Sequence, residues 1–163
     1  MPGHTLTCEL IVPASMGEVF AFFQNPYNLE KITPPWLNLR VVTCDLAMRA
    51  GAEIDYEFRW LGVPLKWRTV ISEYEPPEYF LDEALSSPYV YWRHYHSFRE
   101  TPKGTLVSDR VEYNIPYGFA GRLVHAAIVR RQLTRIFEYR QAAIATHLSA
   151  HAIELKPPRV ASV

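Results

Sequence analysis

The chain has 163 residues, of which 48% are hydrophobic and 13% aromatic, so it is long enough to bury a core of its own. Its 17 Lys and Arg residues balance its 17 Asp and Glu residues, and this neutral charge argues against a nucleic-acid partner. The two cysteines fit no metal or redox spacing, and no apolar run approaches the roughly 20 residues of a membrane span.

These features predict a soluble, cytoplasmic protein without an integral membrane segment. No repeat or linker divides the sequence, and the N-terminus lacks a signal-peptide pattern. We therefore expect a single domain over residues 1–155, followed by a C-terminal tail over residues 156–163 that frays into solvent.

The N-terminal part predicts one strand and two short helices. The strand covers residues 5–12. Ser15 and Glu18 then form a capping-box signature, in which serine caps a helix and glutamate reaches back to it. Asn25 and Pro26 begin a second helix, because asparagine caps well and proline suits the first helical position. This helix must end before the next pair of prolines.

Alternating apolar and polar residues predict strands in the middle of the chain. In residues 52–60 the even positions are apolar and the odd positions from 53 onward are charged, which is typical of a half-buried strand. Similar patterns indicate strands within residues 65–71, 79–84, 89–98 and 104–115. Proline-containing or glycine-containing turns separate them.

A long helix is predicted from Gly118 to about His147, where proline is absent and apolar residues recur at roughly helical spacing. A helix of about 30 residues is near 45 Å long, so it fits across an antiparallel sheet better than inside a sandwich. Its arginines outnumber its single acid, Glu138. We interpret them as a solvated face; a basic surface for an acidic partner or an anionic membrane is the alternative.

Three polar residues are predicted on inward strand faces. Asp109 shares its face with apolar residues of the 104–115 strand, because strand side chains alternate between faces. His94 and His96 share a face with Trp92 on the preceding strand. A carboxylate and two imidazoles are therefore expected inside the protein.

The turn TPKG between these two strands suggests how they pair. Its proline and glycine suit a type I turn, and closing the hairpin there puts Arg93 opposite Glu112 on the outer face. The same register puts His96 opposite Asp109, although a slip of two residues would make His94 the partner. We predict a hydrogen bond between His96 and Asp109, with His94 lining a pocket.

This pair has two compatible interpretations. The two side chains satisfy each other as a buried polar pair, or Asp109 orients a histidine that faces a cavity as a general base or as a contact for a polar ligand group. Metal binding is less favoured. His94, His96 and Glu100 match the first half of the cupin metal pattern, but Glu100 lies at the turn and no third histidine falls on a suitable later strand. We expect no metal and no cofactor.

Taken together, we expect an α+β order of one strand, two short helices, six strands, five of which are located by the patterns above, and a long C-terminal helix. This order resembles the helix-grip fold of the START-like or SRPBCC superfamily, which includes polyketide cyclase/dehydrase relatives. The motifs resemble an uncharacterised bacterial group within it, sometimes labelled cell-division-inhibitor-like. The resembling segments cover most of the chain and are FAFFQNPYNLEKITPPWL (20–37), GVPLKWRTVI (62–71), SPYVYWRHYHSF (87–98), GTLVSDRVEY (104–113) and IFEYR (136–140).

The resemblance implies a curved, seven-stranded antiparallel sheet wrapped around the long helix, with an apolar cavity between them. Trp36 would sit near one mouth of this cavity. From the helix, Phe137 and Arg140 are expected to face the sheet, where Arg140 would meet a carboxylate such as Asp82. The residues that the resemblance places around the cavity are Tyr56, Phe58, Trp67, Trp92, His94, His96, Asp109 and Tyr113.

Three functions follow as expectations. The first is binding of a hydrophobic or aromatic small molecule, such as a lipid, polyketide or quinone-like compound, in the cavity. The second is an enzyme of the cyclase or dehydratase type, with His96 as base, Asp109 orienting it and Tyr113 as acid or hydrogen-bond donor. The third is an adaptor or a lipid/quinone chaperone that meets a partner through the helix surface. No particular protein partner is indicated.

Overall fold

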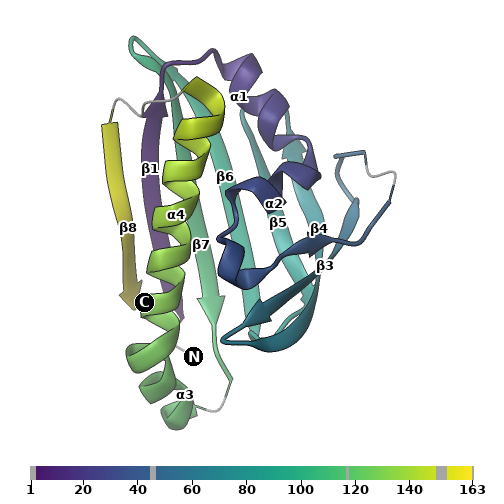
Figure 1. Cartoon of the computed structure of the whole chain (residues 1–163), viewed down its shortest axis with the longest axis vertical. Helices are drawn as coiled ribbons and strands as arrows, with labels where there is room; N and C mark the ends of the chain where they lie inside the picture. Colours follow the sequence, from purple (N-terminus) through teal and green to yellow (C-terminus); the bar gives the residue numbers. More distant parts are fainter. Residues whose placement is uncertain (1–2, 45–46, 117, 150–153, 163) are drawn as a thin grey trace.

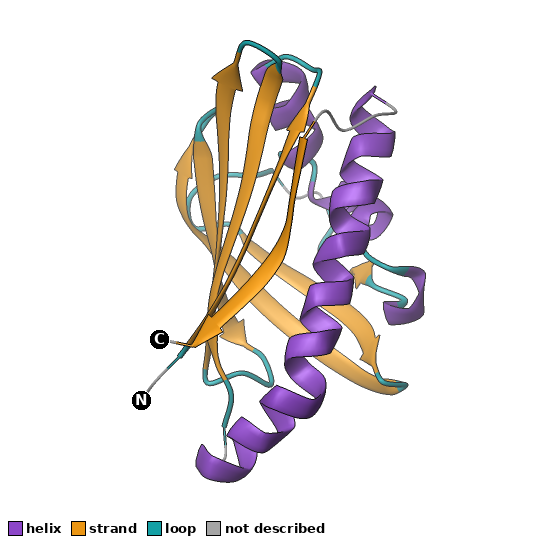
Figure 2. Ribbon diagram, turned by 90° about the vertical axis from the view of Figure 1, so that its left-hand side faces the viewer, coloured by secondary structure: helices purple, strands orange, loops and turns teal. Residues whose placement is uncertain are grey.

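A computed structural model describes residues 3–44, 47–116, 118–149 and 154–162. Within them, a curved antiparallel sheet carries a long helix across one face (Figures 1 and 2). Eight strands of these residues are hydrogen-bonded in the order β2-β3-β4-β5-β6-β7-β1-β8. Their bounds are β1 His4–Val12, β2 Arg40–Val41, β3 Glu53–Trp60, β4 Val63–Glu75, β5 Tyr79–Ser86, β6 Tyr91–Thr101, β7 Gly104–Asn114 and β8 Glu154–Ser162.

Short helices follow β1 and cover one end of the sheet (Figure 1). The capping box predicted for the first of them is confirmed, since Ser15 and Glu18 satisfy each other's backbone N–H groups. Asn25 also caps as predicted, by accepting a hydrogen bond from the Tyr27 N–H, but the segment begins as a 3₁₀ turn. The bounds are α1 Met16–Phe23, η1 Pro26–Asn28, α2 Leu29–Ile32 and η2 Pro35–Leu37.

The predicted long helix is confirmed and consists of three consecutive parts. They are α3 (Gly118–Val124), the π-helical turn η3 (His125–Val129) and α4 (Arg130–Ser149). A π turn inserts one extra residue into the helical repeat and so rotates the side chains that follow. Among the described helices, none is long and apolar enough to cross a membrane. The cytoplasmic location stays a prediction.

The α+β helix-grip fold is therefore confirmed, and the order of elements up to the long helix is as predicted. The chain beyond the helix was predicted wrongly. Residues 156–163 were expected to fray, but β8 pairs antiparallel with β1 and adds an eighth strand to the seven expected. Pro157 and Pro158 argue against a strand in sequence, yet an edge strand tolerates prolines, and the register with β1 shifts where they lie, between Thr7 and Glu9.

The hairpin of β6 and β7 has the predicted register. Arg93 lies opposite Glu112, and His96 lies opposite Asp109. Gly104 has a φ of 128° and lies against the backbone of β1, so a side chain there would clash. The register of β6 against β7 fixes which polar side chains face inward.

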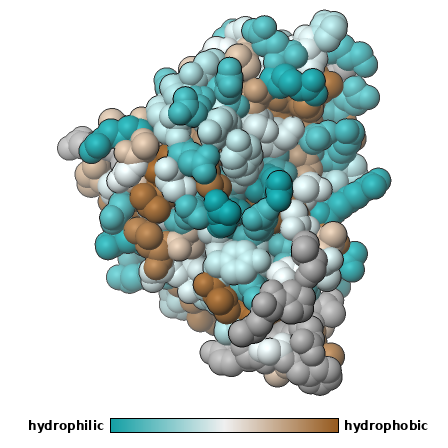
Figure 3. All heavy atoms as spheres, turned by 180° about the vertical axis from the view of Figure 1, so that it is seen from behind, coloured by the Kyte–Doolittle hydropathy of each residue, from teal (hydrophilic) through white to brown (hydrophobic). Residues whose placement is uncertain are grey.

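The side of the molecule away from α4 is mostly hydrophilic (Figure 3).

Gln141 of α4 connects the helix to the sheet edge. Its Nε2 donates to the backbone carbonyls of Glu9 in β1 and Lys156 in β8, each at 2.9 Å. The side chain is buried, so these carbonyls depend on it at the point where the two strands change register. One polar side chain thus joins the C-terminal strand to the long helix.

Replacing Gln141 with leucine should destabilise the fold, because two carbonyls lose their donor. We expect a loss of about 1–3 kcal/mol in the free energy of unfolding, measured by urea denaturation. The control is Gln24→Leu, since Gln24 is exposed. Equal stability of the two variants would contradict this role.

His125 fixes the start of the long helix against β1 and β7. Its ring stacks on His4 with 3.5 Å between ring centroids, and its Nε2 lies 2.8 Å from the Tyr113 hydroxyl. Burial, followed by the nearby His4 and Arg130, lowers the pKa of His125 to about 4 from its ordinary value of 6.5. The folded protein therefore favours the neutral ring.

Acid should weaken the fold through this group. Between pH 6.5 and about 4 the unfolded chain binds a proton that folded His125 does not, so the free energy of unfolding falls as the pH drops through this range. Above pH 6.5 the contribution is fully present. Urea midpoints measured across this range should fall less steeply for His125→Gln than for the wild type; parallel pH profiles would show that His125 is not responsible.

Candidate functional site

A cavity of about 550 Å³ lies between the inner face of the sheet and the helices. Its lining is predominantly apolar and includes rings from β3, β4 and β6 together with side chains of α4. A cavity of this size suits a small organic molecule. Of the residues predicted for the site, those that line it are Tyr56, Phe58, Trp67, Asp82, Trp92, His94, His96, Phe137 and Arg140.

Three predicted residues lie elsewhere. Trp36 is 46% exposed and packs against Tyr139 of α4, outside the cavity lining. Tyr113 is fully buried, and its hydroxyl meets His125, so the expectation that it faces the cavity is wrong. Asp109 is also buried and stands behind the two histidines.

Sequence reasoning missed part of the lining. Trp60 occupies the same even positions of its strand as Tyr56 and Phe58, so the alternation could have identified it. Tyr89 precedes β6 in an irregular segment, and its ring packs 5.0 Å from Trp92 between centroids. No periodic pattern predicts such a residue.

The polar part of the cavity wall comes from three neighbouring strands. Asp82 of β5 lies opposite His94 of β6, and His96 of β6 lies opposite Asp109 of β7. All four side chains point to the inner face, because residues two apart on a strand share a face. Two aspartates therefore flank two histidines.

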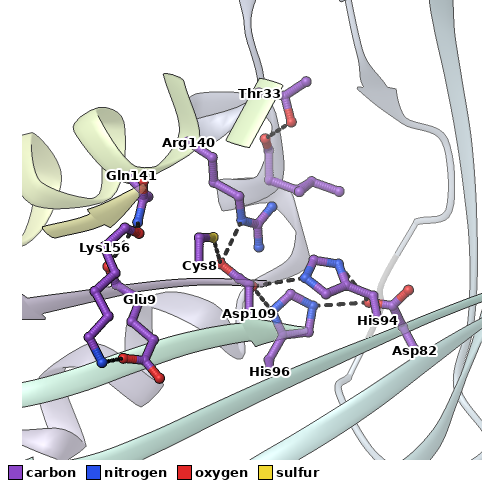
Figure 4. Close-up of polar contacts among 11 residues, drawn as sticks. Cys8, Glu9, Thr33, Asp82, His94, His96, Asp109, Arg140, Gln141 and Lys156 are labelled. Atoms are coloured by element: carbon purple, nitrogen blue, oxygen red, sulfur yellow. Dashed lines mark hydrogen bonds and ion pairs between the residues drawn. The ribbon is translucent and has the colours of Figure 1, made fainter. Parts of the chain in front are cut away.

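Figure 4 shows how these side chains meet. His94 Nε2 lies 2.8 Å from Asp109 Oδ1, and His96 Nε2 lies 3.0 Å from Asp82 Oδ2. His96 Nδ1 is 3.0 Å from Asp109 Oδ1, but its orientation is poor for a hydrogen bond. The two rings are 3.7 Å apart between centroids. Each hydrogen bond thus runs diagonally across the strand pairing.

This arrangement corrects two predictions. The hydrogen bond to Asp109 comes from His94 and not from His96, because the diagonal contact is better aligned than the directly opposite one. Arg140 meets Asp109 and not Asp82, with its Nε 3.8 Å from Asp109 Oδ2. Asp82 was predicted as a site residue, but its role as the partner of His96 was missed.

Asp109 is the anionic centre of the cluster. Burial would raise the pKa of its carboxyl, but the Arg140 guanidinium and the two histidines hold that pKa well below its usual range. The Cys8 thiol adds a long contact of 3.9 Å to Oδ2. An ionised carboxylate only accepts hydrogen bonds, so His94 must donate from Nε2. Its Nδ1 then carries a lone pair.

The pKa values of the two imidazoles shift in opposite directions. Burial, followed by the neighbouring His96, lowers the pKa of His94 to about 4. Burial also lowers the pKa of His96, but its contacts with Asp109 and Asp82 outweigh this and raise it overall. The pair therefore favours a neutral His94 beside a more basic His96.

The cluster can serve proton transfer, hydrogen bonding or metal ligation. Asp82, His94 and His96 each offer a ligand atom, and these atoms lie within 4.8 Å of one another. From the sequence, no third histidine ligand for a metal was expected on a suitable strand. Asp82 supplies a third ligand from the neighbouring strand, whereas Glu100 is exposed and is not part of the group.

Comparisons with solved structures show the same fold. The chain is similar to protein Ms6760 from Mycobacterium smegmatis, with a TM-score of 0.66, 20% identity, and coverage of 90% of this chain and 91% of that one. It is similar to the di-domain ARO/CYC StfQ from the steffimycin biosynthetic pathway, with a TM-score of 0.71, 13% identity, and coverage of 90% and 50%. The third is Ara h 8.0201, with a TM-score of 0.60, 11% identity, and coverage of 88% and 99%.

A search of curated proteins found no match. None of the reported matches supports the narrower resemblance to a cell-division-inhibitor-like group. The model of the family described as polyketide cyclase / dehydrase and lipid transport matches residues 12–137, which is more than half of the chain. The chain therefore belongs to the polyketide cyclase / dehydrase and lipid transport family within the SRPBCC superfamily.

Proposed function

We propose that the protein binds a hydrophobic or aromatic small molecule in the cavity between the sheet and the long helix. The observation that carries this proposal is a predominantly apolar cavity of about 550 Å³ whose wall includes the polar cluster of Asp82, His94 and His96. Burying the apolar body of a ligand there contributes roughly 25 cal/mol per Å² of apolar surface removed from water. Lipids, polyketides and quinone-like compounds have this character.

The wall offers two kinds of contact to such a molecule. Trp67, Trp92 and Tyr89 pack together, with 5.0–5.6 Å between their ring centroids, and present aromatic surface. Asp82 and the two histidines provide hydrogen-bonding groups in the same cavity. A molecule with an apolar ring or chain and one polar end satisfies both. The proposed ligand is therefore amphipathic.

Filling the cavity should reduce binding. Val129 lines the cavity, and Val129→Phe places extra atoms where the ligand body would lie. With anilinonaphthalenesulfonate as a fluorescent probe, we expect binding at least about tenfold weaker, equivalent to about 1.4 kcal/mol. Val90→Phe is the matched control, because Val90 is 58% exposed. Equal loss in both variants, or none in either, would contradict binding in this cavity.

The natural ligand can be identified directly. Native mass spectrometry of protein purified from its own host should show one bound small molecule that is released on denaturation. Val129→Phe purified in the same way should carry less of it, whereas Val90→Phe should carry as much as the wild type. A wild-type protein without any bound molecule, and without affinity for the probe, would overturn the proposal.

A second function, an enzyme of the cyclase or dehydratase type, is favoured by one observation. Asp109 supports His94 and His96 from behind while both rings reach the cavity wall. Such support orients a group that transfers protons in a bound substrate. Tyr113 has no part in this function, because its hydroxyl is turned to His125.

Replacing His96 with asparagine separates the two functions. If the cavity only binds, His96→Asn should keep the affinity for the ligand recovered from the host within a few-fold. If it catalyses, the wild type should convert that ligand to a product of different mass or ring structure, and His96→Asn should not. Mass spectrometry and NMR of the recovered small molecule provide the readout. Unchanged ligand after prolonged incubation with the wild type would exclude its catalytic conversion.

A further inference from the structure

We propose that Asp82, His94 and His96 form a binding site for a divalent transition-metal ion in the wall of the cavity. The three residues come from adjacent strands, and all three line the cavity. Their ligand atoms lie within 4.8 Å of one another. The proposal concerns these side chains alone and does not depend on which organic molecule the cavity holds.

The separations between the ligand atoms are close to those around a single bound ion. Asp82 Oδ2 lies 3.0 Å from His96 Nε2 and 3.8 Å from His94 Nδ1. Ligand atoms bound at about 2.1 Å to a common ion stand roughly 3–3.5 Å apart. The separations, which reach up to 4.8 Å, must shorten toward this range when an ion binds.

One carboxylate lies next to the nitrogen of each ring that points away from the proposed ion. Asp109 Oδ1 lies 2.8 Å from His94 Nε2 and 3.0 Å from His96 Nδ1. These are the nitrogens that the proposed ion does not use. Histidine ligands in metalloproteins typically donate their second N–H to such a carboxylate, which fixes the ring and leaves the other nitrogen with a lone pair. Asp109 supplies this support to His94 through a hydrogen bond and lies beside Nδ1 of His96.

A proton or a metal ion can lie between Asp82 and His96. Each nitrogen of His96 lies 3.0 Å from a carboxylate oxygen, and carboxylates accept but do not donate. A neutral imidazole has one N–H and can satisfy only one of them. A proton on Nε2, as in the hydrogen bond to Asp82, or a metal ion in its place satisfies the side toward Asp82, and Nδ1 of His94 lies 3.8 Å from that same oxygen.

The ligand set selects the type of ion. Two imidazoles and one carboxylate suit zinc and the divalent ions of the iron group, whereas magnesium and calcium prefer oxygen ligands. With Asp82 and Asp109 as anions, Arg140 as a cation and both rings neutral, a divalent ion leaves the cluster with one positive charge. An anionic oxygen of a molecule in the adjoining cavity would balance that charge and complete the coordination.

Titration with Co²⁺ and Zn²⁺ tests the site. Protein without an affinity tag, stripped with a chelator, should bind one Co²⁺ with visible d–d absorption bands, and Zn²⁺ should displace it. In Asp82→Asn, which keeps the side-chain shape, the affinity for Zn²⁺ should fall at least about tenfold by calorimetry. His147→Gln is the control, because it removes a histidine that is exposed on α4.

Several results would overturn the proposal. They are the absence of saturable binding by the wild type, equal affinity of Asp82→Asn and wild type, or binding that is lost in His147→Gln. The last result would mark an adventitious surface ion. If Asp82→Asn fails to fold, the electron paramagnetic resonance spectrum of Cu²⁺ bound to the wild type tests the site instead. Its nitrogen couplings report how many imidazoles bind the ion. Two imidazole nitrogens are expected, and one or none would contradict the site.

Discussion

The buried ion pair between Asp109 and Arg140 is the constraint on which the polar half of the cavity depends. Asp109 is 3% exposed and Arg140 is 6% exposed, so each charge has left water. Removing one partner of such a pair typically costs about 3–5 kcal/mol, because the other charge stays buried alone. The pair also fixes α4 against β7, and Arg140 lies 5.9 Å from the rings of Phe23 and Phe137. The position of the long helix and the charge of the cluster are therefore set together.

Polar contacts connect this ion pair to side chains of three strands. Asp109 aligns both imidazoles, and His96 in turn meets Asp82, so polar atoms of β5, β6 and β7 form one connected group. Around it the cavity wall is predominantly apolar, with both aromatic and aliphatic side chains. A buried polar group of this kind gives an amphipathic ligand a single favourable orientation, since its polar end has one place to bond. The same connected group accounts for the proposed metal site.

The helices, most of the strands and the hairpin of β6 and β7 were predictable, because each is specified by residues that are close together in the sequence. The turn between β6 and β7 has only two residues outside the strands, so its chemistry fixed the register of His96 and Asp109. The partner of His96 was not predictable in this way, because β5 joins β6 through the irregular residues 87–90, whose sequence carries no turn signal that fixes the register. The strand at residues 154–162 was missed because its prolines disfavour a strand unless a free sheet edge is available, which only the tertiary structure supplies.

Asp109 accepts a hydrogen bond from Nε2 of His94 and so leaves Nδ1 of this ring with a lone pair, 3.8 Å from Asp82 in the cavity wall. Long-range ¹H–¹⁵N correlation spectra of the imidazoles in metal-free protein report this protonation state. We expect His94 to be neutral near pH 7, with its proton on Nε2 and a lone pair on Nδ1. An Asp109→Asn substitution should remove this preference. A His94 ring protonated at Nδ1, or a spectrum unchanged by the substitution, would show that Asp109 does not set the state of this ring.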